Sequence, residues 1–358
     1  MLYSLKSFKG IILTHNISLI YSKMMLGLES TVKRNALLSD EDTVPKLRLP
    51  FIKHGYRRPC LSAMECLASV FKVHNETCNI WSHFIPFILL VCTYLKFFNE
   101  HSIWDPLMWP LLSFASLSSY VFLISSFAHT FCVMSPNSIG LKGWSDSDMD
   151  DILFSLDYAG VSMLNFGFGQ GYLFYTGVSE SSVNYHIKLY FFVLIMACNC
   201  ATYVAMKSYI NREKIVTVSG QIVFVVPYIL SISPFLWRLS SNTIRFDENL
   251  SIMFFSHMLM FSLGISLFGL KLPERLAPGH FDSLGHSHNW MHVFTALGVF
   301  MTQYLFMYAI STRDDLPGHK ITAWDTFGFL FVCIVSNITI VVVVVFRRFH
   351  IRIRQKEL

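Results

Sequence analysis

The chain has 358 residues, of which 53% are hydrophobic and only 14% are charged, and its mean hydropathy is +0.47. A soluble globular protein carries roughly 25% charged residues, so this composition excludes an ordinary soluble domain and indicates a membrane protein. The net charge of +5 comes from short basic clusters. Such clusters are typical of attraction to anionic lipids, and nothing in the sequence suggests nucleic-acid binding.

Runs of about 18 or more mostly apolar residues are long enough to cross a bilayer as helices. In chain order, the sequence predicts eight such spans: 79–98, 109–131, 153–175, 189–207, 216–238, 251–271, 289–311 and 326–346. The segments between them are mostly short. We therefore expect an all-α membrane protein with one bundle of helices and not several domains.

Residues 1–78 precede the first span and mix basic residues with one modest apolar stretch, IILTHNISLIYSKMML. This stretch lacks a clear small-residue cleavage site, so we interpret residues 1–78 as a cytoplasmic arm that is amphipathic or disordered. An uncleaved signal-like segment is the alternative. The helical bundle then covers residues 79–346, and residues 347–358, RRFHIRIRQKEL, form a basic cytoplasmic tail.

The distribution of Lys and Arg predicts the orientation of the spans. If the N-terminus is cytoplasmic, 22 of the 28 Lys and Arg residues lie on the cytoplasmic side and 6 on the other side. Basic residues near the ends of spans mark the cytoplasmic side, and without the arm the loops and tail still divide 11 to 6. We therefore expect both termini in the cytoplasm.

Ionisable groups inside predicted spans are costly in a bilayer and indicate functional sites. With the predicted orientation, the second span ends in SSFAHTF, which contains Ser125 and, one helical turn later, His129. The third span begins near Asp157, and the seventh begins SHNWMHVF with His288 and His292. All five side chains therefore fall at one depth, near the cytoplasmic leaflet.

The spacing of the histidines suggests a metal site. His288 and His292 are four residues apart, so they share one helix face about 6 Å apart and can chelate a zinc ion, with His129 as the third ligand. Three protein ligands and one open position are typical of a catalytic zinc site. Ser125 and Asp157 could then hold a water molecule there. The alternative is a polar cavity of hydrogen-bonded groups, with the histidines reaching toward the membrane interface.

Other polar residues near this predicted site have less definite roles. His286 lies two residues before His288 on a different helix face, and we expect it to be an interfacial bystander. The segment VFKVHNETCNIWSH places Glu76 just before the first span, where a helix cap and an interfacial Trp are the simplest interpretation. Glu76 could also reach the cytoplasmic-side site, but no spacing places it there. None of the eight cysteines falls in a predicted outer loop, so we expect no structural disulfides.

Four segments, in this order, resemble the signatures of the progestin and adipoQ receptor (PAQR) family. They are GYRRPCLSAMECLASVFKVHNETCNIWSH, SSFAHTF, SLDYAGV and LPERLAPGHFDSLGHSHNWMHVF. The LPERLAPG segment and the eighth span resemble the membrane progestin receptor branch. The resemblance covers about residues 51–311 and implies a seven-transmembrane-helix PAQR bundle, here with an eighth C-terminal span and a cytoplasmic N-terminus.

The family resemblance also implies a zinc ion near the cytoplasmic face, held by one His of the second span and two of the seventh. The positions that match are His129, His288 and His292, and the matching polar partners are Ser125 and Asp157. The loop 140–151, GLKGWSDSDMDD, looks longer and more acidic than the branch pattern, and the outer loops match it less closely. Because these outer surfaces vary with the ligand, the resemblance leaves the ligand open.

The resemblance implies two functions that can hold together. The first is a plasma-membrane receptor that binds a steroid, a progestin by its branch, or a related lipid, and signals to cytoplasmic partners such as G proteins. The second is a zinc-dependent amidase, related to alkaline ceramidases, that releases a fatty acid and a sphingoid base. There Asp157 would act as general base and Ser125 as hydrogen-bond donor. A scaffold that anchors soluble partners through the arm is a weaker third possibility.

Overall fold

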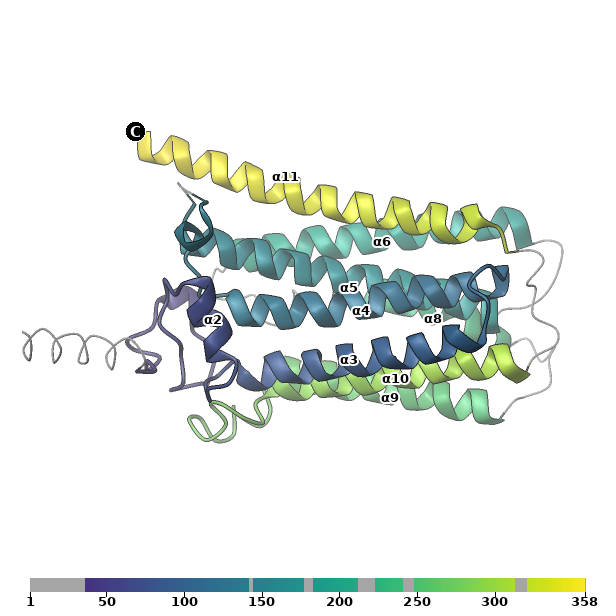
Figure 1. Cartoon of the computed structure of the whole chain (residues 1–358), viewed down its shortest axis with the longest axis horizontal. Helices are drawn as coiled ribbons and strands as arrows, with labels where there is room; N and C mark the ends of the chain where they lie inside the picture. Colours follow the sequence, from purple (N-terminus) through teal and green to yellow (C-terminus); the bar gives the residue numbers. More distant parts are fainter. Residues whose placement is uncertain are drawn as a thin grey trace, which may run out of the picture.

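The computed structural model describes residues 36–141, 144–176, 183–211, 223–240, 248–312 and 321–357. In this part of the chain, eight long helices lie side by side along one axis (Figure 1). They are α3 (Thr77–Glu100), α4 (Trp109–Phe131), α5 (Asp146–Thr176), α6 (Val183–Asn211), α8 (Val225–Ser240), α9 (Glu248–Leu270), α10 (Ser287–Thr312) and α11 (Phe329–Glu357). Shorter helical segments are η1 (Pro45–Leu47), α2 (Ala63–Ser69), η2 (Pro106–Met108), η3 (Pro136–Ile139) and η5 (Trp324–Gly328).

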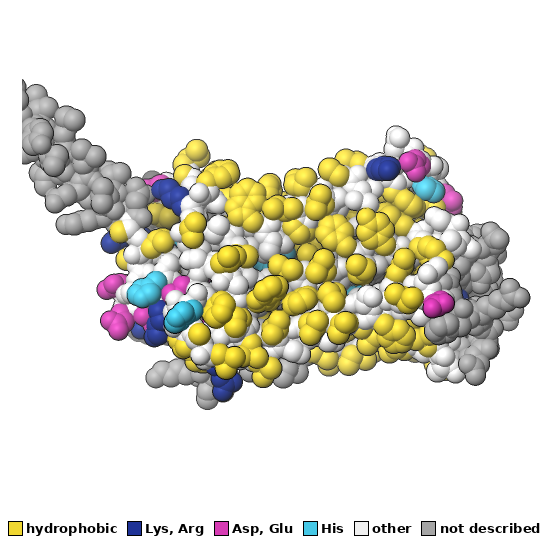
Figure 2. All heavy atoms as spheres, turned by 90° about the horizontal axis from the view of Figure 1, so that it is seen from below, with side chains coloured by type: hydrophobic (Ala, Val, Ile, Leu, Met, Phe, Trp, Pro, Cys, Tyr) yellow, Lys and Arg dark blue, Asp and Glu magenta, His cyan; other side chains and the backbone are white. Residues whose placement is uncertain are grey.

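The chain is a multi-pass integral membrane protein. Among the described residues, six helices are long and apolar enough to cross a membrane: α3, α4, α6, α9, α10 and α11. α8 is apolar but shorter, with 16 residues, and α5 has 31 residues with acidic ones in its first turns. Figure 2 agrees, since hydrophobic side chains cover the middle of the visible face and charged side chains gather toward its two ends.

The all-α membrane fold expected from composition is confirmed, and a helix lies at each of the eight predicted spans. Residues 216–222 of the fifth predicted span lie outside the described residues. So does the whole stretch IILTHNISLIYSKMML of the predicted arm, which falls within residues 1–35. The orientation of the helices across the bilayer stays a prediction.

Aromatic and small residues pack the interior of the bundle. Phe114 of α4, Phe168 and Tyr172 of α5 and Phe306 of α10 are fully buried in one cluster, to which α3, α8 and α9 also contribute. Gly171 on α5 lies directly against the Phe306 ring, where an added Cβ would overlap the ring. Small residues allow such close approach between helices in a membrane, where packing rather than water exclusion holds helices together.

The N-terminal segment, residues 36–76, covers one end of the bundle (Figure 1). Its backbone pairs with the residues after α4 through the bridge between Leu61 and Met134. It also joins the loop between α9 and α10, because Asp282 accepts hydrogen bonds from the backbone N–H groups of Lys53 and His54, at 2.9 and 2.8 Å. This segment therefore closes the end of the bundle at which α4 ends and α10 begins. The division of the chain into an arm and a bundle at residue 78 stays a prediction.

The eighth long helix, α11, packs against α5 and α6. Inside this contact, the Thr202 hydroxyl of α6 donates a 2.5 Å hydrogen bond to the Asn337 side chain, and both residues are fully buried. At the end of the bundle near α2, Arg348 of α11 and Lys46 of the N-terminal segment both pair with Asp151, at 3.2 and 2.6 Å. All eight cysteines are free, as expected.

Candidate metal centre

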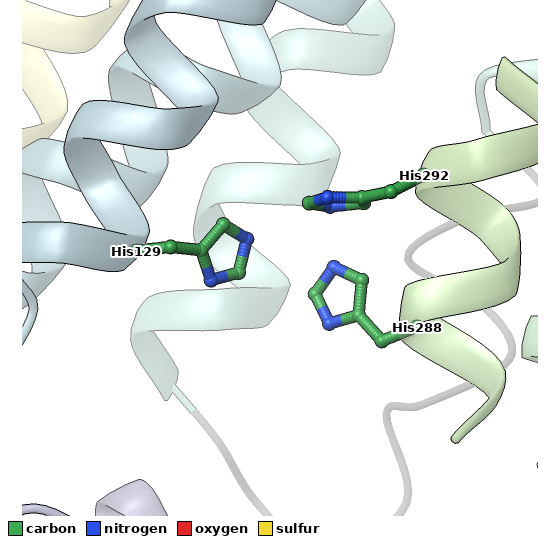
Figure 3. A group of neighbouring side chains, drawn as sticks. All are labelled: His129, His288 and His292. Carbon is green, nitrogen blue, oxygen red and sulfur yellow. The ribbon is translucent and has the colours of Figure 1, made fainter. Parts of the chain in front are cut away.

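Three histidines from two helices converge at the end of the bundle covered by the N-terminal segment (Figure 3). His129 lies in the last turn of α4, and His288 and His292 lie in the first turns of α10. One nitrogen from each ring lies within 4.8 Å of the other two, and the ring centroids are 4.6 to 5.0 Å apart. The three-histidine group could therefore hold a metal ion.

Local sequence explains why α10 begins where it does. Gly285 adopts a positive φ of 82°, which an L-side chain rarely takes, and it turns the chain into the helix. Glu274, from the LPERLAPG segment, then accepts hydrogen bonds from the backbone N–H of Ser287, at 2.7 Å, and from the Ser287 hydroxyl. This buried carboxylate occupies the positive end of the helix dipole. His288 and His292 therefore project from a firmly capped helix start.

Outer hydrogen bonds orient two of the three rings. Nδ1 of His129 lies 2.7 Å from the Glu76 carboxylate, and Nδ1 of His292 lies 3.2 Å from both the backbone oxygen of Asn79 and the Ser82 hydroxyl. These contacts leave Nε2 of each ring for a ligand role. Nε2 of His129 is buried and has no hydrogen-bond partner among the described residues. A carboxylate or carbonyl behind the ring is the usual arrangement for a metal-ligating histidine, so these residues fit a zinc ion.

The Glu76 carboxylate that contacts Nδ1 of His129 is ionised. Burial opposes its ionisation, but the neighbouring His129 ring and the hydrogen bond from the Asn79 side chain outweigh burial and lower the pKa of Glu76. Glu76 directly precedes α3, so the first residues of that helix reach the three-histidine group. The carboxylate therefore stays ionised and can accept a hydrogen bond from His129.

Ser125 and Asp157 lie together beside the histidines. Ser125 is buried one helical turn before His129, and its hydroxyl donates a hydrogen bond of 3.4 Å to the Asp157 carboxylate. Asp157 projects from α5 and is close enough to His129 for an electrostatic interaction between them. The structure thus brings Ser125 and Asp157 to the group that the sequence associated with them, although their roles stay predictions.

Three residues of α3 also contact the three-histidine group, and the sequence analysis did not place any of them there. Asn79 and Ser82 contact His292, and the ring of His83 stacks on the His292 ring with centroids 3.7 Å apart. Both His83 nitrogens are buried without a partner among the described residues. Glu76, Asn79 and His83 follow each other at intervals of three and four residues, which places them on one helix face. That spacing is the signal that could have found them.

His286 is buried and is not part of the three-histidine group, in keeping with its expected role as a bystander, whereas its depth relative to the membrane interface stays a prediction. His286 is 2% exposed, and its Nε2 lies 3.2 Å from the backbone oxygen of Asn75 and 3.0 Å from the Asn289 side chain. The N-terminal segment covers it and removes it from solvent. Its nitrogens are not part of the three-histidine group, so it packs the wall of the site.

Comparison with known proteins finds a matching family and several relatives that align with most of the chain. Residues 71–303 match the family described as haemolysin-III related. The chain is 32% identical to membrane progestin receptor gamma-A of Danio rerio over 327 residues, which cover 81% of this chain and 88% of that protein. It is 31% identical to membrane progestin receptor gamma of Homo sapiens, over 70% of this chain and 74% of the relative. It is 32% identical to membrane progestin receptor delta of Homo sapiens, over 69% and 71% respectively.

Proposed function

Because the chain belongs to the haemolysin-III related family, which includes the PAQR proteins, we propose that it is a membrane receptor for a steroid or a related lipid. A progestin is the first ligand to test. The observation that carries this proposal is the similarity, at about the 30% level over more than two thirds of the chain, to proteins named membrane progestin receptors. We further propose seven family spans plus α11 as an eighth, with a cytoplasmic N-terminus, in the plasma membrane.

In this proposal the ligand reaches the bundle from the lipid phase and shifts its helices. The signal passes to cytoplasmic partners, of which G proteins are the first class to test. The N-terminal segment and the end of α11 lie at the same end of the bundle as the three histidines (Figure 1). If that end of the bundle faces the cytoplasm, a movement of the helices around the histidines would change the surface that a cytoplasmic partner contacts.

The three histidines are proposed to hold zinc. The described part of the chain brings three imidazole nitrogens together as a candidate ligand set, and three protein ligands leave an open position, as in catalytic zinc sites. When bound, zinc would supply a Lewis acid that polarises a carbonyl group and acidifies water. His129 and His292 are held for this purpose by Glu76 and by the Asn79 backbone oxygen.

A lipid amidase is the second candidate function, and the hydrogen bond between Ser125 and Asp157 beside the histidines favours it. Asp157 would accept a proton from water as the water attacks the amide carbonyl, and would deliver that proton to the leaving nitrogen. Ser125 holds the Asp157 carboxylate in place and, by rotating its hydroxyl, can donate to the developing oxyanion. A zinc ion that only stabilises the fold would need neither residue.

One set of measurements on the purified full-length chain separates these functions. Zinc content, binding of labelled progesterone and release of fatty acid from ceramide are measured for the wild-type protein and for Asp157→Asn. Loss of hydrolysis with retained steroid binding would establish an enzyme with a separate ligand site. Asp105→Asn is the matched control, because Asp105 is exposed and lies just before α4 at the other end of that helix from His129.

Each further outcome of this experiment has a defined meaning. Steroid binding without any hydrolysis would leave a receptor in which zinc is structural. Hydrolysis without progesterone binding would favour the amidase and contradict a progestin as the ligand of the receptor. A wild-type protein that contains no zinc would contradict the metal centre and with it the proposed amidase mechanism.

A further inference from the structure

We propose that Arg57 is a positioning residue of the metal centre: it holds the end of α4 from which His129 reaches the metal. The proposal rests on the proposed zinc centre and goes beyond it, because Arg57 lies in the N-terminal segment, outside the helices that carry the three histidines. It gives that segment a role in the chemistry of the site and not only in covering the bundle.

The Arg57 guanidinium is buried at the C-terminal end of α4, with 4% of the residue exposed. Nη2 donates to the backbone oxygen of His129 at 2.6 Å, and Nη1 donates to the backbone oxygen of Thr130 at 2.8 Å. The last carbonyl groups of a helix have no partner within the helix, and a cation there is favoured by the helix dipole. Arg57 therefore closes the helix end at the very residue whose side chain is a proposed ligand.

The guanidinium is itself fixed by its remaining neighbours. Nη1 also donates to the Ser69 hydroxyl at 2.8 Å, and Nη2 lies 3.3 Å from the Cys132 sulfur. The Ser69 hydroxyl in turn donates to the backbone oxygen of Cys66 in α2, at 2.7 Å. A buried charge is stable only when it is well hydrogen-bonded, and this set of contacts meets that need for both terminal nitrogens. The helix end is thus tied to a locked group and not to a mobile side chain.

His129 is held by the N-terminal segment from two sides. Arg57 binds its backbone oxygen, and Glu76 binds Nδ1 of its ring. His288 and His292 lie instead on α10, whose start is capped by Glu274. Since helix ends fray when their terminal groups are unpaired, loss of Arg57 would free the His129 side of the three-histidine group and leave the α10 side in place.

The experiment compares Arg57→Lys with Arg58→Lys in the full-length protein. Lys keeps the charge but lacks the planar fork that reaches two carbonyls at once. The matched control changes the adjacent, exposed arginine in the same way. The dissociation constant for zinc is measured by competition with a chelator, and the melting temperature is measured on the zinc-free protein. Cobalt is then substituted for zinc, because its visible absorption reports the geometry of the ligands.

We expect Arg57→Lys to raise the dissociation constant for zinc about tenfold or more, the effect typical of groups that orient a metal ligand. The cobalt spectrum should change, whereas Arg58→Lys should match the wild type in both measurements. A structural role alone would lower the melting temperature of the zinc-free protein and leave the dissociation constant and the cobalt spectrum unchanged. That result, or an equal effect of Arg58→Lys, would overturn the proposal.

A milder variant keeps the test decisive if Arg57→Lys does not fold. Ser69→Ala removes one partner of the guanidinium and leaves both carbonyl contacts available. We expect it to raise the dissociation constant by a smaller factor than Arg57→Lys, and wild-type zinc affinity in a folded Ser69→Ala protein would count against Arg57. A wild-type protein that binds no zinc would instead remove the metal centre itself, so the two failures are told apart in the wild-type measurement.

Discussion

At the scale of single residues, the three histidines depend on groups that carry no metal themselves. Glu76 is the clearest case, because its carboxylate lies 2.7 Å from Nδ1 of His129 and also accepts a hydrogen bond from Asn79. A carboxylate in this position fixes the ring and makes its other nitrogen a better donor to a metal. The strength of metal binding should therefore follow the charge of Glu76.

Replacing Glu76 with Gln should raise the dissociation constant for zinc by about 10- to 100-fold, the range known for such supporting groups. The shape of the side chain is kept and its charge is lost, so the ring of His129 is held less firmly and its outer nitrogen becomes a weaker ligand. Chelator competition on the purified protein measures the effect. Glu65→Gln is the control, because Glu65 is exposed and caps α2. Equal zinc affinity in the two variants would contradict the role given to Glu76.

At the scale of helices, the sequence predicts the elements better than their contacts. Among the described residues, six of the eight long helices follow apolar runs long enough for a bilayer, so hydropathy alone predicts their positions, whereas α5 and the 16-residue α8 do not meet that criterion. Contacts such as that between Gly171 on α5 and Phe306 on α10 depend on residues 135 positions apart. The local sequence does not predict such contacts, because it does not show whether a Gly in a span faces lipid or another helix.

Gly171→Ala should destabilise the bundle by about 1–3 kcal/mol, the usual cost of overpacking a filled core. The added methyl group would overlap the Phe306 ring, which is fully buried. Gly269→Ala on α9 is the matched control, because nothing lies within 4 Å of its added Cβ. Alanine is the better helix former by about 1 kcal/mol, so the control should be neutral or slightly stabilised. The measurement is unfolding in detergent.

A second substitution, Phe306→Leu, tests whether overlap with the Phe306 ring causes the loss of stability in Gly171→Ala. Phe306→Leu should make Gly171→Ala less costly than it is in the wild-type background, because the smaller side chain leaves room for the methyl group. Equal stability of Gly171→Ala and Gly269→Ala would show that α5 and α10 are not packed closely at this point.

The attachment of α11 to α6 gives a further prediction at this scale. The buried hydrogen bond between Thr202 and Asn337 should show a coupling energy of about 0.5–1.7 kcal/mol in a double-mutant cycle with Thr202→Val and Asn337→Leu, as for other hydrogen bonds between membrane helices. Thr339→Val is the control, because Thr339 is exposed and its hydroxyl donates to the backbone oxygen of Val335 in its own helix. A coupling near zero would mean that the hydrogen bond between Thr202 and Asn337 does not help to hold α11 against α6.

At the scale of the whole molecule, the sequence predicted the group of His129, His288 and His292 but not its support. The position of a residue along a predicted span gives its depth in the membrane, and helical spacing gives the helix face. Residues from distant spans could therefore be placed at the same depth. Arg57 lies in the N-terminal segment with no spacing that relates it to a histidine, and only the fold brings it to His129. Glu76 differs, because its spacing from Asn79 and His83 is a helical signal that the sequence contains. The family resemblance covers this segment as well, but a resemblance does not say which atoms meet.

Orientation is the property of the whole molecule that decides which side of the membrane the metal centre serves. The described start of the N-terminal segment, the end of α11 and the three histidines lie at one end of the bundle (Figure 1). The topology predicted from the sequence assigns 22 of the 28 Lys and Arg residues to this side of the membrane, which predicts that it is the cytoplasmic side. Ligand access to the metal centre would then come from lipid or cytoplasm and not from the outer solution.

Epitope tags at residue 1, after residue 358 and within residues 313–320, between α10 and α11, test this orientation in intact cells. Both terminal tags should be protected from external protease until the plasma membrane is permeabilised, and the internal tag should be cleaved in intact cells. Reversed accessibility would place the three histidines near the outer face and contradict the cytoplasmic signalling role. Terminal tags on opposite sides would mean that an odd number of helices crosses the membrane. The 16-residue α8 would then be the first candidate for a helix that does not cross.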